Sequence, residues 1–209
     1  MKQATGSKAP HAADRVSIQQ SLDGHSFSVV GLDGDFPGEE AVEVEVLTPQ
    51  TLLVPSGFLQ TLTPAELLAA AGMACTEYQQ AVRSLPTTLG RTTEVVAVMA
   101  VSTSALQAVR ERLGYRASFT TPLLAGPVAG RPTVWLHLRA GILYIKVFDR
   151  TLRMAEAIPA PSDADLLYFA DRLSRAFPLG DMLLRAVGRE AKALRKLLGH
   201  RFRDVVCAS

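Results

Sequence analysis

The chain has little cysteine: only Cys75 and Cys207 occur among its 209 residues, and they are far apart in the sequence. Two isolated thiols provide no disulfide framework, and the lack of a C-x-x-C pair excludes the common zinc and dithiol redox motifs. Such cysteine usage fits a reducing compartment, so we expect a cytoplasmic protein.

Long apolar runs are also missing. No stretch reaches the ~18 consecutive apolar residues that a membrane-spanning helix requires, so we expect no membrane span. Residues 1–14 are polar and lack the apolar core of a signal peptide, and we interpret them as a disordered leader. The G-x-x-x-x-G-K-[ST] and G-x-S-x-G motifs are absent too, which removes two common sources of phosphate and acyl-transfer chemistry.

Hydrophobic residues nevertheless make up 48% of the chain, and their spacing near the N-terminus is that of strands. Alternating segments at 15–20, 27–30 and 41–47 are separated by turn-rich stretches, so we expect a three-stranded meander. A fourth apolar piece covers 51–54. The valine-rich run 93–101 is typical of a strand that is buried on both faces.

Helical spacing begins at Thr63-Pro64 and extends to Cys75, with a break expected around Gly72 and a second helical stretch over 78–85. A helix over 105–113 and a strand over 116–124 follow. After a Gly/Pro-rich linker at 126–132, the opening pattern returns as strands at 133–138, 142–148 and 152–158. A helix starting at Ser162, a basic helix over 182–198 and a last strand over 201–207 complete the expected order.

This order of elements predicts an α/β fold with mixed sheets. Three meandering strands followed by a helix and a parallel strand make a ribonuclease-H-like half, and the pattern occurs twice. We therefore expect two tandem halves at 15–125 and 133–209, the second one shortened. Two such halves in tandem form the actin-like ATPase architecture.

Four stretches also carry a resemblance to a known family. They are L-D-G-H-S-F-S-V (22–29), L-L-V-P-S-G-F-L (52–59), V-W-L-H-L-R-A-G-I-L-Y-I-K-V-F (134–148) and D-A-D-L-L-Y-F-A (163–170). Through them the chain resembles an uncharacterised bacterial family, a domain of unknown function whose members adopt a degenerate actin-like ATPase fold. The resemblance covers about residues 15–208. It implies a fold and carries no established activity.

An actin-like ATPase holds Mg²⁺ and the phosphates of ATP between two acidic hairpin turns. Asp23, Gly24 and Ser26 partly match the first turn, although a plain Asp-Gly turn is the favoured interpretation. At the second turn, Arg139 and Gly141 could contact a phosphate, but an arginine cannot hold a cation. We therefore expect no metal and no ATP/Mg²⁺ cofactor, with weak nucleotide binding left open.

The histidines show no metal-ligand spacing, and we expect His137 to pack against a helix rather than to bind a metal.

Positive charge concentrates near the C-terminus. Between Arg185 and Arg203 seven Lys and Arg residues face Glu190 alone. On the expected helix over 182–198 they form a candidate interaction patch on the outer face, comprising Arg185, Arg189, Lys192, Arg195 and Lys196. A solvated helix face is favoured over a patch that binds nucleic acid or an acidic partner.

Three functions remain open. The first is a non-catalytic, actin-like module that binds an unidentified protein partner or serves as a scaffold. The second is an accessory protein that binds nucleic acid through the basic helix, and the third is a weak nucleotide-binding ATPase. The lost second acidic turn argues against an enzyme, and the sequence leaves the oligomeric state open.

Overall fold

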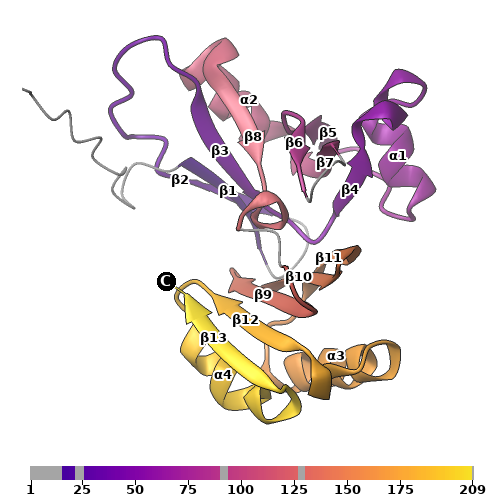
Figure 1. Cartoon of the computed structure of the whole chain (residues 1–209). Coiled ribbons are helices and arrows are strands. Elements are labelled where there is room, and N and C mark those ends of the chain that lie inside the picture. The colour runs from indigo at the N-terminus through magenta and orange to yellow at the C-terminus, as the bar shows by residue number, and fades with distance from the viewer. Residues whose placement is uncertain (1–15, 22–25, 90–93, 127–129, 209) are drawn as a thin grey trace, which may run out of the picture.

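The computed structural model describes residues 16–21, 26–89, 94–126 and 130–208. The alternating and valine-rich segments form three sheets. In Figure 1 the two sheets from the N-terminal part of the chain lie above the sheet from the C-terminal part. The expected leader at 1–14 lies outside the described residues. The division at 126–132 stays a prediction, and residues 127–129 of that linker are outside the described part as well.

The first sheet has the strand order β2-β1-β3-β8. Its strands are β1 (Val16–Gln20), β2 (Phe27–Val30), β3 (Val42–Leu47) and β8 (Ala117–Thr120). β2 runs antiparallel to β1, whereas β3 runs parallel to β1 and β8 runs parallel to β3.

The expected meander is therefore wrong at its third strand. β3 lies on the far side of β1 instead of beside β2. The connection between β2 and β3 is too long for a tight hairpin, and arginines hold it from the other side: Arg112 donates to the carbonyl of Gly34, and Arg116 to those of Phe36 and Gly38. Between β1 and β8, Val44 and Val46 become fully buried.

A small antiparallel sheet, β4-β7-β5, is inserted between β3 and the next long helix. It consists of β4 (Thr51–Pro55), β5 (Gln79–Arg83) and β7 (Glu94–Ser102), with β6 (Thr87–Thr88) also paired to β7. Ala97, Met99 and Val101 pack toward α2 (Thr103–Leu113), while Val98 and Ala100 pack toward α1 (Pro64–Ala70). The prediction of a strand buried on both faces is confirmed.

The first helix ends at Ala70, next to the break that the sequence predicts around Gly72. A capping box begins it, because Thr63 accepts from the Glu66 backbone N–H and Glu66 accepts from Thr63 in return. Gly72 then takes φ +74°, a backbone conformation that stops the helix. The expected second helix over 78–85 is wrong, since β5 pairs with β7 there and buries Val82.

The last sheet has the order β11-β10-β9-β12-β13. The antiparallel meander is β9 (Thr133–Arg139), β10 (Ile142–Asp149) and β11 (Thr151–Pro159); β12 (Leu183–Val187) and β13 (Asp204–Ala208) are parallel to β9. α3 (Asp163–Ala176) and α4 (Ala191–Leu198) cover the face turned away from the first sheet (Figure 1). This sheet has five strands, and the expectation that the second half is shortened stays a prediction.

Short 3₁₀ segments join several of these elements: η1 (Ser56–Gln60), η2 (Gly114–Arg116), η3 (Pro122–Leu124), η4 (Leu179–Asp181) and η5 (Gly199–Arg201). None of the helices in the described ranges has the length and apolar character needed to cross a membrane.

The basic helix expected over 182–198 is also wrong in its first part. Residues 183–187 form β12, whose Leu184 and Ala186 are fully buried between β9 and β13. Gly188, at φ +81°, separates this strand from α4. The apolar residues fit helical spacing in the sequence, but the strand buries them in a period of two. Arg185 consequently lies on a strand, away from the cations of α4.

The two larger sheets repeat one arrangement. In each, an antiparallel hairpin (β1-β2 or β9-β10) lies beside two parallel strands (β3 and β8, or β12 and β13), and a helix (α2 or α4) precedes the last strand. The second half adds β11 and α3, and the first half instead carries the small sheet with α1. The turns β1-β2 and β9-β10 therefore occupy equivalent positions.

Candidate functional site between the two sheets

The first of the equivalent turns is described only at its base. Asp23 and Gly24 lie outside the described residues, so their proposed role stays a prediction. Ser26 is exposed just before β2, and its carbonyl accepts a hydrogen bond from the Ser21 N–H at 2.8 Å.

The second turn is well defined. Ala140 and Gly141 both have positive φ, at 51° and 72°, the backbone of a tight hairpin turn in which glycine carries no steric cost. Arg139, at the end of β9, forms an ion pair with Glu45 of β3. Glu45 is only 8% exposed, so this pair joins the two halves through a buried carboxylate.

The face of the last sheet that carries Arg139 looks toward the first half. Lys146 pairs with Trp135, Tyr144 with His137, and Ile142 with Arg139 across β9 and β10, which places all six side chains on this face. The alternate residues Val134 and Leu136 belong to the core beneath α3 and α4. We call the six residues the inner face.

His137 therefore does not pack against a helix as expected. Its Nδ1 atom is buried without a hydrogen-bond partner, and its ring meets Trp135 edge-on at 5.7 Å. Burial, together with the charges of Arg139 and Lys146, lowers the pKa of His137 to about 4. A methyl group on Gly188 would lie 2.5 Å from the His137 Nε2 atom, so only glycine leaves room for this ring.

Lys146 is fully buried on the inner face. Its Nζ donates to the carbonyl of Ala125 and lies 4.2 Å from the centre of the Trp135 ring, a cation–π contact. Burial lowers the pKa of this ammonium to about 8. The lysine thus fastens the inner face to the segment that follows η3.

Apolar packing fills the remaining space between the sheets. One cluster combines inner-face residues with residues of the first half and of β11; its buried members are Leu47, Leu123, Trp135, Ile142, Tyr144 and Ala157. Next to it, the Thr48 hydroxyl donates to the Gln20 side chain at 3.0 Å. Burial and then Glu45 raise the pKa of the Tyr144 phenol, which keeps it protonated at neutral pH.

These residues do not fit a Mg²⁺–triphosphate. Mg²⁺ prefers carboxylate and water oxygens, whereas the second turn presents a guanidinium that is already paired with Glu45. Among the described residues, no three His, Cys, Asp or Glu side chains gather into a metal-binding group. Among the described residues, the two sheets are joined by the Arg139–Glu45 ion pair and by apolar packing.

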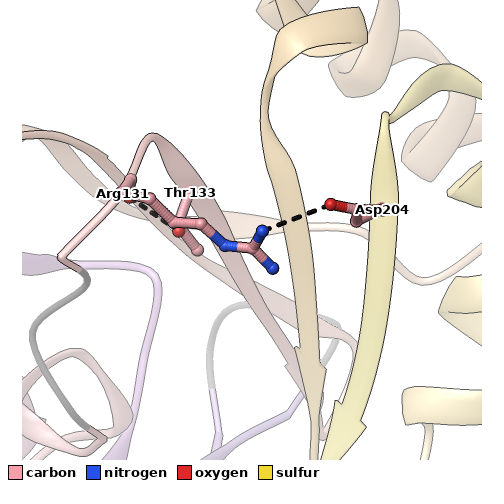
Figure 2. A network of polar contacts seen from close by, with 3 residues as sticks. All are labelled: Arg131, Thr133 and Asp204. Atoms are coloured by element: carbon pink, nitrogen blue, oxygen red, sulfur yellow. Dashed lines mark hydrogen bonds and ion pairs between the residues drawn. The ribbon is translucent and has the colours of Figure 1, made fainter.

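A second ion pair ties the last sheet together at its far edge. Figure 2 shows Arg131, just before β9, with its guanidinium 3.2 Å from the carboxylate of Asp204 on β13. The Thr133 hydroxyl donates to the Arg131 carbonyl at 2.9 Å. Both charged side chains are more than half exposed, so this pair contributes little to stability.

The structure divides the predicted basic patch. Arg185 is half-buried on β12, opposite Trp135 and therefore on the same side of the sheet as the inner face. Arg189, Lys192, Arg195 and Lys196 are exposed on or just before α4, on the other side. Glu45 and Lys146 were not predicted as site residues from the sequence; the signal for Lys146 was a charge inside the otherwise apolar strand 142–148.

No protein-family model and no curated protein matches this chain. Among solved structures, it is similar to a protein from Bacteroides thetaiotaomicron with an actin-like ATPase fold and unknown function. That match has a TM-score of 0.64 and 15% identity, and covers 93% of this chain and 90% of the other.

Two weaker matches belong to bacterial secretion and pilus systems. The PilM-PilN type IV pilus biogenesis complex matches with a TM-score of 0.43 and 12% identity, over 93% of this chain and 86% of the other. The cytoplasmic domain of EpsL, an inner-membrane component of the Vibrio cholerae type II secretion system, matches with a TM-score of 0.41 and 15% identity, over 82% and 80%. The strand order and the likeness to the Bacteroides thetaiotaomicron protein agree with the fold expected from the sequence. The chain has the actin-like ATPase fold.

Proposed function

We propose that this chain is a non-catalytic actin-like module that works by binding other proteins. The observation that carries the proposal is the Arg139–Glu45 ion pair. It places a cation at the turn where an ATPase needs a carboxylate, and it pairs that cation with a buried acid of the other half.

Packing between the sheets supports the same function. Trp135, Tyr144 and Leu123 are buried against one another. A triphosphate entering here would have to separate this cluster and break the ion pair, with a loss of several buried contacts. The module is therefore suited to act as one fixed body whose outer surfaces bind partners.

Calorimetric titration of the whole chain with ATP and Mg²⁺, together with a phosphate-release assay, tests the proposal. We expect neither heat of binding nor turnover. Two variants sharpen the result: Asp23→Ala removes the acid of the first turn, and Arg139→Ala removes the cation that is paired with Glu45. Micromolar ATP binding that Asp23→Ala abolishes, or release of phosphate above background, would overturn the proposal in favour of a nucleotide-dependent enzyme.

A further inference from the structure

Positively charged Lys and Arg side chains are missing from a long part of the chain. Residues 16–82 contain no Lys or Arg at all. Five exposed carboxylates lie close together in this part, in the connection between β2 and β3 and at the start of β3. We call these residues the acidic segment: Asp33, Asp35, Glu39, Glu40 and Glu43.

The opposite charge gathers on α4. Leu194 and Leu198 bury one side of this helix against the last sheet. Four exposed cations lie on the other side of α4 or two residues before it, next to the exposed Glu190, and we call them the basic face: Arg189, Lys192, Arg195 and Lys196. The spacing of Lys192, Arg195 and Lys196 keeps these cations on one side of the helix.

Among the described residues, neither charged surface forms an ion pair. The three ion pairs among the described residues join Arg131 to Asp204, Arg139 to Glu45 and Arg201 to Asp171, so none involves the acidic segment or the basic face. Arg112 and Arg116 do approach the acidic segment, but they donate to backbone carbonyls and leave the carboxylates to solvent.

The acidic segment and the basic face also lie at opposite ends of the folded molecule. In Figure 1 the indigo connection between β2 and β3 is at the top of the first half, and the yellow helix α4 is at the bottom of the second. They cannot meet within one molecule, although each has the charge that the other lacks. Between molecules, complementary patches steer and orient association.

We propose that the basic face of one copy docks on the acidic segment of a second copy. The occupant follows from charge complementarity, and Val30, 50% exposed beside the acidic segment, adds an apolar contact. Because the two patches differ, the contact is head-to-tail and leaves one patch of each kind free, so copies add into a chain or close into a ring. The inference rests on the proposed function, since it names a second copy as a protein that the module binds.

Analytical ultracentrifugation of the full chain tests this contact. At low ionic strength we expect species larger than the 22.4 kDa monomer, returning to monomer in about 1 M salt, where screening acts over about 3 Å. Reversing the basic face (Lys192→Glu, Arg195→Glu, Lys196→Glu) or the acidic segment (Glu39→Lys, Glu40→Lys, Glu43→Lys) should each give a monomer. Circular dichroism verifies that each variant is folded.

The decisive chain carries all six substitutions. Its formal net charge is again +2, and its two patches are again complementary with their signs exchanged, so assembly should return. A matched control reverses exposed cations elsewhere (Arg150→Glu, Arg153→Glu, Arg175→Glu) and should assemble like the original chain.

A monomer at low salt, assembly that survives either reversal, or a six-substitution chain that stays monomeric would overturn the inference. Retention of DNA or RNA by a monomeric chain, lost when the basic face is reversed, would also overturn it and assign that face to nucleic acid. The proposed function has a separate readout: it fails only if ATP binds or is hydrolysed, whatever the state of assembly.

Discussion

In the first half β1 lies between an antiparallel β2 and a parallel β3, and in the second half β9 lies between an antiparallel β10 and a parallel β12. The directions match, but the surfaces do not. From the second half, Arg139 pairs with the Glu45 carboxylate of the first half, and Lys146 donates to the Ala125 carbonyl. Trp135 packs against apolar side chains of the first half. The two halves therefore share a topology but present different side chains to each other, and these side chains pack into one interface.

Removing the largest side chain of this interface should have the largest effect. Trp135 is 2% exposed and packs against residues of both halves, so Trp135→Ala should lower the free energy of unfolding by about 3–5 kcal/mol. Trp135 is the chain's one tryptophan, so the variant has no tryptophan fluorescence to follow. Urea unfolding monitored by circular dichroism therefore measures the loss. Tyr115→Ala, at a position 88% exposed, should change stability by no more than about 0.5 kcal/mol; an equal loss in both variants would contradict the packed interface.

A smaller loss should follow from crowding His137. Gly188→Ala combines an unfavourable φ with a contact of 2.5 Å to the His137 ring, and we expect a cost of about 3 kcal/mol. Gly72→Ala shares the positive φ but meets no atom within 4 Å, so it isolates the backbone cost of about 1–2 kcal/mol. In a His137→Ala background the cost of Gly188→Ala should fall to that of Gly72→Ala; if it does not, the ring is not what excludes a side chain.

The ion pair between the halves comes next. Arg139→Ala leaves the buried carboxylate of Glu45 without its cation and should cost about 1–3 kcal/mol. Glu45→Gln should cost a similar amount, and the double variant should cost clearly less than the two losses together, as a double-mutant cycle by urea unfolding will measure. Additive losses would mean that the two residues act independently.

Acid should weaken the interface through His137. The pKa of this group is lowered from 6.5 to about 4 in the folded chain, so the unfolded chain binds more protons between these values. The contribution of the neutral His137 to the free energy of unfolding is fully present above about pH 6.5, and the free energy should decline by about 1–3 kcal/mol as the pH falls toward 4. His137→Gln should flatten this part of the profile of unfolding free energy against pH, and an unchanged profile would contradict the role of this ring.

Sequence periodicity predicted most elements because burial follows it closely. The run 93–101 is buried on both faces, and the second meander lies where alternation placed it. The stretch 183–187 was misassigned since its leucines and valine fit both periods, and Gly188 was the break that decided between them.

Glu45 could not be recognised from its surroundings, where it alternates with valines like a solvent-facing residue. Its partner Arg139 is 94 positions later, and only the approach of the two halves brings them together. The site therefore depends on a long-range contact that local pattern does not encode.

The smallest effect should come from the ion pair that stays within one half. Arg131 and Asp204 lie 3.2 Å apart but are 58% and 51% exposed, so water and salt screen their attraction. Asp204→Asn should change the free energy of unfolding by no more than about 0.5 kcal/mol in urea unfolding. The contrast with Glu45→Gln is the informative quantity, because both substitutions remove one carboxylate charge from one arginine. A cost at Asp204 equal to that at Glu45 would mean that burial between the halves adds nothing to the Arg139 pair, and the interface would then be held by packing alone.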